Sequence, residues 1–454
     1  MDRREFIAKL FERARQKAPD AADFACEVCA ASDESFEVQI KDGEIYQYNV
    51  SDGGGLGFRV LVNGRMGYAS TQILDEEAID LLADGALENA ALVESKDRQF
   101  LFGGSESYPE LKLYEPKLEA LSAAEKIEMA RTLEKLTLAQ DARIEQVEDC
   151  AVFSSSEEML LTNTRGLDVS SKGNLMGAYV SAIARDGDRV NTGFKMAFSM
   201  DPDAIDLEKL AKAAAREALD GLEASQAESG EYRVLLRSDV AATLLSTFSG
   251  VFSAENAQRG LSRLKGREGE MIADACVTIM DDPHRAGSAA STPFDGEGVA
   301  TRAKAVVENG RLNTLLHNLK TANKDGVSTT ANASRPGYAA PVGVAPTNFY
   351  FKPMDVDLEG MIEKVGDGLL ITEMQGMHAG ANPITGDFSL AAKGFRVRGG
   401  ARAEAVAQIT IAGNFYDVLK NVEAVGGDLE FLSPSVSCFG SPSLLVKKLS
   451  VAGK

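Results

Sequence analysis

Apolar residues recur at helical spacing near the start of the chain. Phe6, Leu10 and Phe11 lie on one stripe of the segment Met1–Lys17 and predict an amphipathic helix there. A second stripe, formed by Ala78, Leu81, Leu82 and Ala86, predicts a helix over residues 75–93. The polar, Gly- and Pro-containing stretch that follows, residues 94–115, is typical of a connection.

Between these two helices, apolar or β-branched residues flank two short turn signals. The signals are Asp42-Gly43 and Asn63-Gly64. Both pairs suit type I′ hairpin turns, because such turns need a positive φ at both central residues. We therefore expect antiparallel strands across residues 36–69. The run Gly53–Gly57 interrupts this pattern, and we interpret it as a glycine-lined bulge between strands.

The middle of the chain repeats this combination of helix and strands. Ser122 and Glu125 form a capping-box pattern in front of an apolar run, which predicts a helix start. Residues 142–198 alternate between polar and apolar and contain turn signals at Arg165-Gly166 and Asp186-Gly187, so we expect a strand meander. The segment Leu207–Leu222, rich in Ala, Lys and Glu, predicts a further helix.

The last half is dominated by short β-like runs. Ser238 is placed to cap a helix from Asp239 to about Gln258. Beyond it, short β-branched runs alternate with glycine-rich turns, including a hairpin signal at Asn309-Gly310. The pattern predicts an α+β protein. An N-terminal antiparallel sheet with flanking helices should precede a mainly antiparallel, barrel- or sandwich-like domain with a few helices.

Length suggests more than one domain. A chain of 454 residues is too long for one ordinary core. We expect an N-terminal α+β domain over residues 1–105 and a C-terminal β-rich domain over residues 229–454. The central α+β segment, residues 106–228, is either separate from the first domain or continuous with it.

Charge and cysteine content narrow the function. The formal net charge is -20, which repels phosphate backbones and argues against nucleic acid as a partner. Met1–Lys17 is charged and lacks the apolar core of a signal peptide, and no run of about 18 apolar residues predicts a membrane span. Five cysteines do not make a disulfide framework in a chain of this size. We expect a soluble, cytoplasmic protein with no membrane partner.

Motif chemistry alone reveals no active site. The chain has three histidines, and none forms a pair at helical spacing that would hold a metal. The cluster Asp281-Asp282-Pro283-His284 resembles a ligand set but also suits a strand end followed by a turn. Cys26 and Cys29 form a CxxC pair, yet in an extended segment their side chains would point to opposite faces. The glycine run matches neither a phosphate loop nor a dinucleotide fingerprint.

Several ordered motifs together resemble one known family. They are the hairpin segment 50–70, the segment 281–298, Glu308–Leu312, Pro346–Asn348, the segment 378–389 and the C-terminal segment 443–453. In this order they resemble the TldD/PmbA family, and they cover most of the chain from about Phe36 onward. The last segment resembles the PmbA, or TldE, type of C-terminus.

The resemblance also implies which subtype the chain represents. In the family, the TldD type carries His-Glu-x-x-x-His on the helix that opens the C-terminal domain. Two imidazoles hold zinc there, the Glu activates water, and a distant Cys completes the site. The corresponding segment here, Leu245–Phe252, contains no His, Cys or carboxylate. Cys438 lies near the position of the family's Cys, and we interpret it as structural.

The resemblance therefore implies a non-catalytic PmbA/TldE-like subunit of a heterodimeric zinc metallopeptidase that degrades or trims unfolded or leader peptides. Zinc is expected in the TldD-like partner, and no cofactor is expected on this chain. The alternative is a homodimeric regulatory or peptide-binding protein without protease activity, to which the family's label "modulator of DNA gyrase" belongs. The candidate residues for lining a peptide chamber are His284, Ser291, Thr292, Asp295, Gly298, His378, Asn382 and Asp387. Their segments equally suit tight turns.

Overall fold

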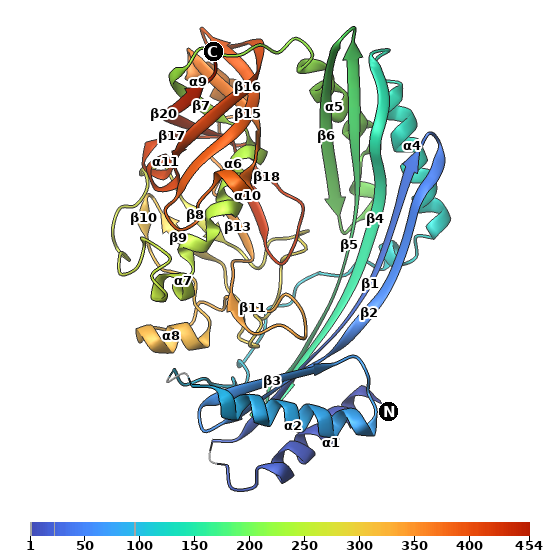
Figure 1. The fold of residues 1–454 in the computed structure, drawn as a ribbon, viewed down its shortest axis with the longest axis vertical. Coiled ribbons are helices and arrows are strands. Elements are labelled where there is room, and N and C mark those ends of the chain that lie inside the picture. Colours follow the sequence, from blue (N-terminus) through green and yellow to red (C-terminus); the bar gives the residue numbers. More distant parts are fainter. Residues whose placement is uncertain (1, 22, 95–96) are drawn as a thin grey trace.

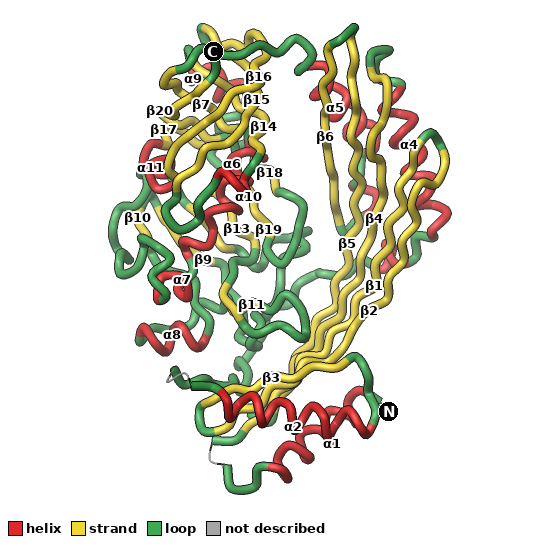
Figure 2. Tube along the Cα trace, viewed as in Figure 1, coloured by secondary structure: helices red, strands yellow, loops and turns green. Residues whose placement is uncertain are grey.

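A long, curved antiparallel sheet forms the N-terminal half of the molecule. The computed structural model describes residues 2–21, 23–94 and 97–454. The strand order is β3-β2-β1-β4-β5-β6, so strands of the predicted first and central segments share one sheet (Figures 1 and 2). The strands are β1 (Ala25–Lys41), β2 (Glu44–Val62), β3 (Arg65–Thr71), β4 (Ile144–Asn163), β5 (Asp168–Asp186) and β6 (Arg189–Ser199).

The predicted hairpin turns have the expected backbone. Asp42 and Gly43 both have a positive φ, 55° and 78°, and so do Asn63 and Gly64, 53° and 79°. These turns connect β1 to β2 and β2 to β3, which confirms the antiparallel strands. The predicted capping box is also present, because Ser122 and Glu125 exchange side-chain and backbone hydrogen bonds at the start of α4.

Helices cover one face of this sheet at both of its ends. Even-numbered residues of β1 point to that face, because side chains alternate along a strand. Val28 packs under α1 and α2, and Val38 packs under α4 and α5. Odd-numbered residues such as Glu27 point to the opposite face, toward the C-terminal half. The helices of this half are α1 (Arg3–Lys17), α2 (Glu76–Leu92), α3 (Pro116–Glu119), α4 (Ala123–Leu138), η1 (Pro202–Ala204) and α5 (Leu207–Asp220).

Three local predictions in this half have clear outcomes. Cys26 packs with α1 and α2 while Cys29 packs in a separate cluster, as the alternation predicts. The prediction that Leu81 lies on the apolar stripe of α2 is wrong, since Leu81 is 67% exposed. The prediction of a bulge at Gly53–Gly57 is also wrong, because these residues pair with β1 without a register shift. Gly55 and Gly57 instead make room for Tyr338, whose carbonyl oxygen would lie 1.7 Å from a Cβ at Gly57.

The C-terminal half contains a closed barrel. Strands β16, β15, β14, β7 and β20 follow one another in the sheet, and β16 also pairs with β20 to close it. Only the pairing of β14 with β7 is parallel among the pairings of these strands in the described residues. The strands are β7 (Gly230–Leu236), β14 (Gly368–Gln375), β15 (Asp387–Arg398), β16 (Ala401–Asn414), β20 (Leu444–Ala452) and the added β17 (Val422–Val425).

A smaller mixed sheet lies below the barrel in Figure 1, with the order β10-β9-β8-β13-β19-β18. Its strands are short, and the Asn309-Gly310 turn connects β9 to β10 as predicted. The strands are β8 (Ile279–Asp281), β9 (Lys304–Glu308), β10 (Arg311–Leu312), β13 (Asn348–Phe351), β18 (Glu430–Phe431) and β19 (Cys438–Ser441). A separate pair consists of β11 (Ala333–Ser334) and β12 (Gly343–Val344). The molecule is α+β, with the mainly antiparallel C-terminal half that the pattern predicts.

Helix α6 (Ser238–Phe248) differs from its predicted form. Its N-cap is Arg237 rather than Ser238, whose hydroxyl donates to Glu430 Oε2 at 2.8 Å. The helix ends at Phe248 instead of Gln258, because a 3₁₀ turn, η2 (Ser249–Phe252), intervenes before α7. Phe248 stacks on Phe415 at 4.9 Å in the core. The remaining helices are α7 (Ala254–Gln258), α8 (Leu319–Asp325), α9 (Leu358–Val365), α10 (Met377–Gly380) and α11 (Phe415–Asn421). No helix in the described ranges is long and apolar enough to cross a membrane.

Candidate functional site

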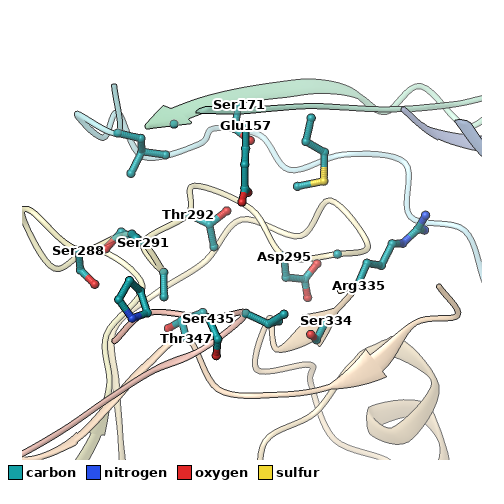
Figure 3. A pocket seen from close by; sticks show the side chains of 18 of the residues that line it. Glu157, Ser171, Ser288, Ser291, Thr292, Asp295, Ser334, Arg335, Thr347 and Ser435 are labelled. Atoms are coloured by element: carbon teal, nitrogen blue, oxygen red, sulfur yellow. The ribbon is translucent and has the colours of Figure 1, made fainter. Parts of the chain in front are cut away.

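A cavity of about 380 Å³ lies between the long sheet and the loops of the C-terminal half. Figure 3 shows Glu157 projecting from the sheet toward loop residues such as Thr292. Eight of the lining residues carry hydroxyl groups. They belong to Ser155, Ser171, Ser288, Ser291, Thr292, Ser334, Thr347 and Ser435. Such a lining offers many hydrogen-bonding groups and few fixed charges, which suits a polar, uncharged ligand surface such as a peptide main chain.

Glu157 reaches the cavity because of its position on β4. Its cross-strand neighbours are Asp33 on β1 and Gly173 on β5. Gly173 has no side chain, and Asp33 carries a charge of the same sign, so neither can neutralise Glu157. Both carboxylates are exposed. On the sheet side of the cavity, Glu157 therefore keeps an exposed carboxylate, while Lys172, which β5 adds to the lining, is paired with Glu119 and Glu158.

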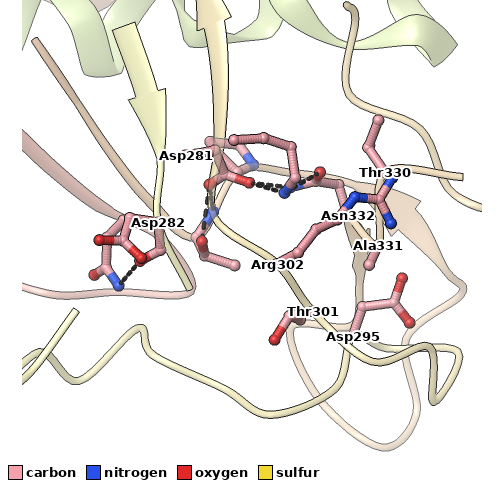
Figure 4. Close-up of polar contacts among 12 residues, drawn as sticks. Asp281, Asp282, Asp295, Thr301, Arg302, Thr330, Ala331 and Asn332 are labelled. Atoms are coloured by element: carbon pink, nitrogen blue, oxygen red, sulfur yellow. Dashed lines mark hydrogen bonds and ion pairs between the residues drawn. The ribbon is translucent and has the colours of Figure 1, made fainter. Parts of the chain in front are cut away.

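The Asp281 carboxylate, which lies outside the cavity lining, accepts hydrogen bonds from two of the loops that line the cavity. Asp281 ends β8 and is fully buried. Its Oδ2 accepts hydrogen bonds from Lys304 Nζ at 2.8 Å and Asn332 Nδ2 at 2.7 Å. Its Oδ1 accepts the backbone N–H of Thr347 at 2.7 Å and the hydroxyl of Thr347 at 2.8 Å. Because Asn332 and Thr347 both line the cavity, this one carboxylate sets the separation of their loops (Figure 4).

Asn348 holds the neighbouring loop in the same way. Its Nδ2 donates to the carbonyl of Asp282 at 2.7 Å and to Ser291 Oγ at 3.0 Å. Its Oδ1 accepts the hydroxyl of Ser288. Asn348 is completely buried, so breaking these bonds would leave its amide unpaired. The two cavity serines are therefore fixed in place rather than free to rotate with the loop.

Asp295 organises the far side of the cavity. Its Oδ1 accepts the backbone N–H of Glu297 at 2.9 Å and of Val299 at 3.1 Å. Its Oδ2 accepts the backbone N–H of Ala333 at 3.0 Å, which joins the loop to β11. Burial raises the pKa of Asp295 against these hydrogen bonds, which lower it. Burial likewise raises the pKa of Glu297, and the Asp295 charge adds to that rise.

The raised pKa of Glu297 predicts a pH-dependent stability. The native state holds the proton of Glu297 more tightly than the unfolded state does. The contribution of Glu297 to the free energy of unfolding is therefore lost as the pH rises from the ordinary pKa of 4.5 through the raised pKa. Glutamine does not titrate. We expect Glu297→Gln to gain free energy of unfolding relative to the natural protein between about pH 5 and about pH 8, measured by urea unfolding. The exposed Glu88→Gln variant is the control, and a change in the opposite direction for Glu297→Gln would contradict the assignment.

A buried ionic cluster anchors the cavity loop to the long sheet. Glu27 Oε1 accepts Arg59 Nε at 2.6 Å and also pairs with Nη2 of Arg335, a residue of the cavity loop. Asn163 Nδ2 donates to Glu27 Oε2 at 3.1 Å. Figure 3 shows Arg335 extending away from the other labelled side chains. Its backbone thus belongs to the cavity while its charge is used to hold the two halves together.

The structure separates the eight candidate residues into three groups. Ser291, Thr292 and Asp295 line the cavity. His284 does not line it but supports it, because His284 Nε2 lies 3.1 Å from Thr301 Oγ1, whose hydroxyl donates to the carbonyl of Thr292 at 2.6 Å.

Gly298 is buried outside the lining. A Cβ there would lie 2.4 Å from Leu167, and the Gly298 carbonyl accepts the Tyr108 hydroxyl at 2.8 Å. Its φ is +82°, a conformation that glycine adopts without strain. The residue therefore allows a close contact between the loop and the long sheet.

His378, Asn382 and Asp387 lie elsewhere, in the connection from β14 to β15. Asn382 Oδ1 accepts the backbone N–H of Ile384 at 3.0 Å, and Asp387 Oδ1 accepts Asn414 Nδ2 at 2.8 Å. None of the three is among the lining residues of the cavity. Asn382 thus forms a turn hydrogen bond, whereas Asp387, the first residue of β15, bonds across the sheet to Asn414 of β16.

Comparison with known proteins identifies the family. Sequence models of the PmbA/TldA metallopeptidase match residues 26–90 as domain 1, 116–222 as the central domain and 229–453 as the C-terminal domain. The chain belongs to the PmbA/TldD family. A metalloprotease PmbA homolog of Haemophilus influenzae is 28% identical over 98% of both chains. The metalloprotease PmbA of Escherichia coli O157:H7 is 27% identical over 99% of this chain and 97% of its own length.

Solved structures of PmbA/TldD relatives have the same fold. A modulator of DNA gyrase from Thermotoga maritima is 34% identical and superposes with a TM-score of 0.90 over 99% of this chain and all of its own. TldE from Thermococcus kodakarensis is 23% identical, with a TM-score of 0.89 over 99% of this chain. The second likeness concerns the fold alone. The sequence matches and the Thermotoga maritima structure place the chain with the PmbA/TldE members of the family.

The residues at the family's zinc position do not fit a metal in this PmbA/TldE-type chain. Helix α6 and η2 carry Leu245, Phe248 and Phe252 there, and all three are buried in the apolar core. Cys438 lies on β19, which packs against α6, but its thiol faces the carbonyl of Leu432 at 3.6 Å and burial raises its pKa. No group of three or more His, Cys, Asp or Glu residues that could hold a metal occurs within residues 2–21, 23–94 and 97–454.

Sequence reasoning missed the residues that come from the long sheet and the β11 loop. Glu157 lies in an alternating strand, and its position opposite Gly173 depends on the strand register. Arg335 lies in the segment Ser334–Gly337, which carries turn residues and no sign of an ion pair with Glu27. A weak signal existed, because Glu27 is a charged residue within a mostly apolar strand segment. Such a residue requires a buried partner.

Proposed function

We propose that this chain is the non-catalytic PmbA/TldE-type subunit of a heterodimeric zinc metallopeptidase of the cytoplasm. Its role is to hold an unfolded or leader peptide in the cavity while a TldD-like partner supplies zinc and cleaves. The observation that carries the proposal is the hydroxyl-lined cavity between the long sheet and the fixed loops. The apolar replacement of the family's zinc ligands on α6 supports the non-catalytic half of the proposal.

The cavity suits an extended peptide for two reasons. Serine and threonine hydroxyls donate and accept, so they can satisfy main-chain N–H and C=O groups of any sequence. Glu157 presents an exposed carboxylate opposite Gly173, and the nearby cation Lys172 on β5 is already paired with Glu119 and Glu158, so Glu157 favours peptides that carry basic residues. The loops are held by Asp281, Asn348 and Asp295, so little ordering free energy is needed on binding.

Blocking the cavity should weaken peptide binding. Ala289 is exposed and lines the cavity, so Ala289→Trp should fill it without disturbing the core. Ala286→Trp is the matched control, since Ala286 is exposed on the same loop and outside the lining. With a fluorescent unfolded peptide of about ten residues, we expect Ala289→Trp to weaken binding at least about tenfold, or 1.4 kcal/mol. Equal affinities for the two variants, measured by fluorescence anisotropy, would refute the cavity as the peptide site.

The homodimeric regulator without a protease remains the competing hypothesis, since one solved relative carries the name modulator of DNA gyrase. The two hypotheses differ in what accompanies the chain in its native cell. Recovery of a chain bearing His-Glu-x-x-x-His with it supports the subunit proposal, and consistent recovery of the homodimer alone supports the regulator. Direct DNA binding is disfavoured under both, because a protein with a net charge of -20 is repelled by the phosphate backbone.

A further inference from the structure

A second cavity, of about 220 Å³, lies where α5 and β6 meet the barrel strands β14, β15 and β16. It shares no lining residue with the hydroxyl-lined cavity. Its volume is below the range of roughly 300–1,000 Å³ that drug-sized ligands occupy, so it would admit only a small molecule or the end of a chain. This site is independent of the proposed peptide cavity.

Positive charge is concentrated around this second cavity although the protein is strongly acidic. Its lining carries the cations Lys195, Arg216, Arg237, Lys393 and Arg402. The lining carboxylates are Glu217 and Asp220. The formal charge of the lining is therefore positive in a chain whose net charge is -20.

Each lining carboxylate is shared by two cations. Glu217 pairs with Lys195 at 3.0 Å and with Arg237 at 2.8 Å. Asp220 pairs with Arg402 at 2.6 Å, and Arg216 Nε lies 3.6 Å from the same oxygen. A shared carboxylate cannot neutralise two cations, so positive charge is left over.

Two carboxylates outside the lining remove part of that excess. Asp239 pairs with Arg237 at 2.6 Å, and Glu373 pairs with Lys393 at 2.5 Å. Asp220 is then left with Arg216 and Arg402 together. Among these residues one positive charge remains without a counter-charge, and Arg216, 70% exposed, has the longer contact to Asp220. A ligand with a single negative charge would balance this remaining positive charge.

Much of the rest of the lining is apolar, apart from Asn191 and Thr372. Leu358, Leu370, Phe395 and Ala405 belong to the small core between the barrel and α9, and they also border the cavity. The Arg402 guanidinium lies 3.8 Å from the centroid of the Phe395 ring, so it joins the charged and apolar sides. A lining that combines convergent charged groups with an apolar side suits a small amphipathic ligand.

We propose that this second cavity binds a small carboxylate on a short apolar chain. The carboxylate would contact Arg216 and Arg402, and the apolar chain would lie against Leu370 and Phe395. A planar guanidinium matches a carboxylate geometrically, which favours Arg over Lys as the contact. The ligand is either a free short-chain carboxylic acid or the carboxyl end of a peptide with an apolar last residue, because both present the same chemistry.

Calorimetric titration of the full chain with hexanoate tests this inference. We expect saturable binding with a Kd of about 1 mM or tighter, and no saturable binding of hexan-1-ol, which lacks the charge. Arg216→Gln should weaken hexanoate binding about tenfold. Arg189→Gln, which removes an exposed arginine outside the lining, should leave it unchanged. Ala213→Leu, which places a larger side chain of α5 into the cavity, should abolish hexanoate binding.

Two further ligands distinguish a free carboxylic acid from the carboxyl end of a peptide. Tighter binding of acetyl-Ala-Leu with a free carboxylate than of hexanoate indicates a peptide end, and the reverse indicates a free acid. In both cases the amidated peptide should fail to bind. The proposal is overturned by equal hexanoate affinities of Arg216→Gln and Arg189→Gln, by binding of the amide, or by inorganic phosphate binding more tightly than hexanoate.

Discussion

Replacing Glu27 by Gln is expected to lower the free energy of unfolding by about 3–5 kcal/mol, because it leaves Arg59 and Arg335 buried without the carboxylate that both of them contact. Glu27 is completely buried, and the Arg59 side chain is 2% exposed. Burial alone would raise the pKa of Glu27, but the charges of Arg59 and Arg335 outweigh it and lower the pKa. Urea unfolding at neutral pH measures the effect.

The lowered pKa gives the same cluster a pH signature. A carboxylate with a depressed native pKa contributes stability above its ordinary value and loses it as pH falls through the native value. Glu27 therefore contributes to acid unfolding, and Glu27→Gln should unfold with a weaker dependence on acid pH. Glu158→Gln is the control, since Glu158 forms an exposed ion pair with Lys172 that is worth at most about 1 kcal/mol. Similar losses in the two variants would contradict a buried anchor.

Asp281→Asn is expected to produce a loss of similar size, about 3–5 kcal/mol. An asparagine at this position has one acceptor oxygen and an amide that donates, so it cannot accept from Lys304, Asn332 and Thr347 together. Lys304 would keep its charge with its side chain only 10% exposed. Because the cavity loops depend on these bonds, peptide affinity should fall together with stability.

The neighbouring Asp282 offers a matched control for Asp281. Its carboxylate accepts the backbone N–H of His284 at 3.0 Å, a bond that an asparagine oxygen can also accept. We expect Asp282→Asn to change the free energy of unfolding by less than about 1 kcal/mol. Thermal and urea unfolding of both variants measure the difference, and a larger loss for Asp282→Asn than for Asp281→Asn would contradict the assigned network.

Features with local causes could be predicted from the sequence. The Asp42-Gly43 and Asn63-Gly64 turns and the Ser122–Glu125 capping box depend on residues within one turn of each other, and all are present. The interpretation of the glycine run failed for a non-local reason. Two of its glycines, Gly55 and Gly57, accommodate Tyr338, a residue from a distant part of the chain. The prediction that Ser238 caps α6 was wrong, because its hydroxyl donates a hydrogen bond to Glu430 instead.

The candidate site shows the same division. Ser291, Thr292 and Asp295 are close in sequence and line one cavity. The partners that fix this cavity come from distant segments, as Asp281 with Thr347 and Glu27 with Arg335 show. Nothing in the local sequence of Glu157 or Arg335 indicates which segment will fold against it. The meeting of the long sheet with the C-terminal loops therefore required the structure.

The central claim is that this chain holds peptide and does not cut it. The most direct test is zinc content and peptide cleavage measured on the chain alone and on the complex recovered from its own cell. The account predicts no stoichiometric zinc and no cleavage for the chain alone, with chelator-sensitive cleavage only when a chain bearing His-Glu-x-x-x-His accompanies it. One tightly bound zinc in the isolated chain, with peptide cleavage abolished by a chelator, would contradict the account.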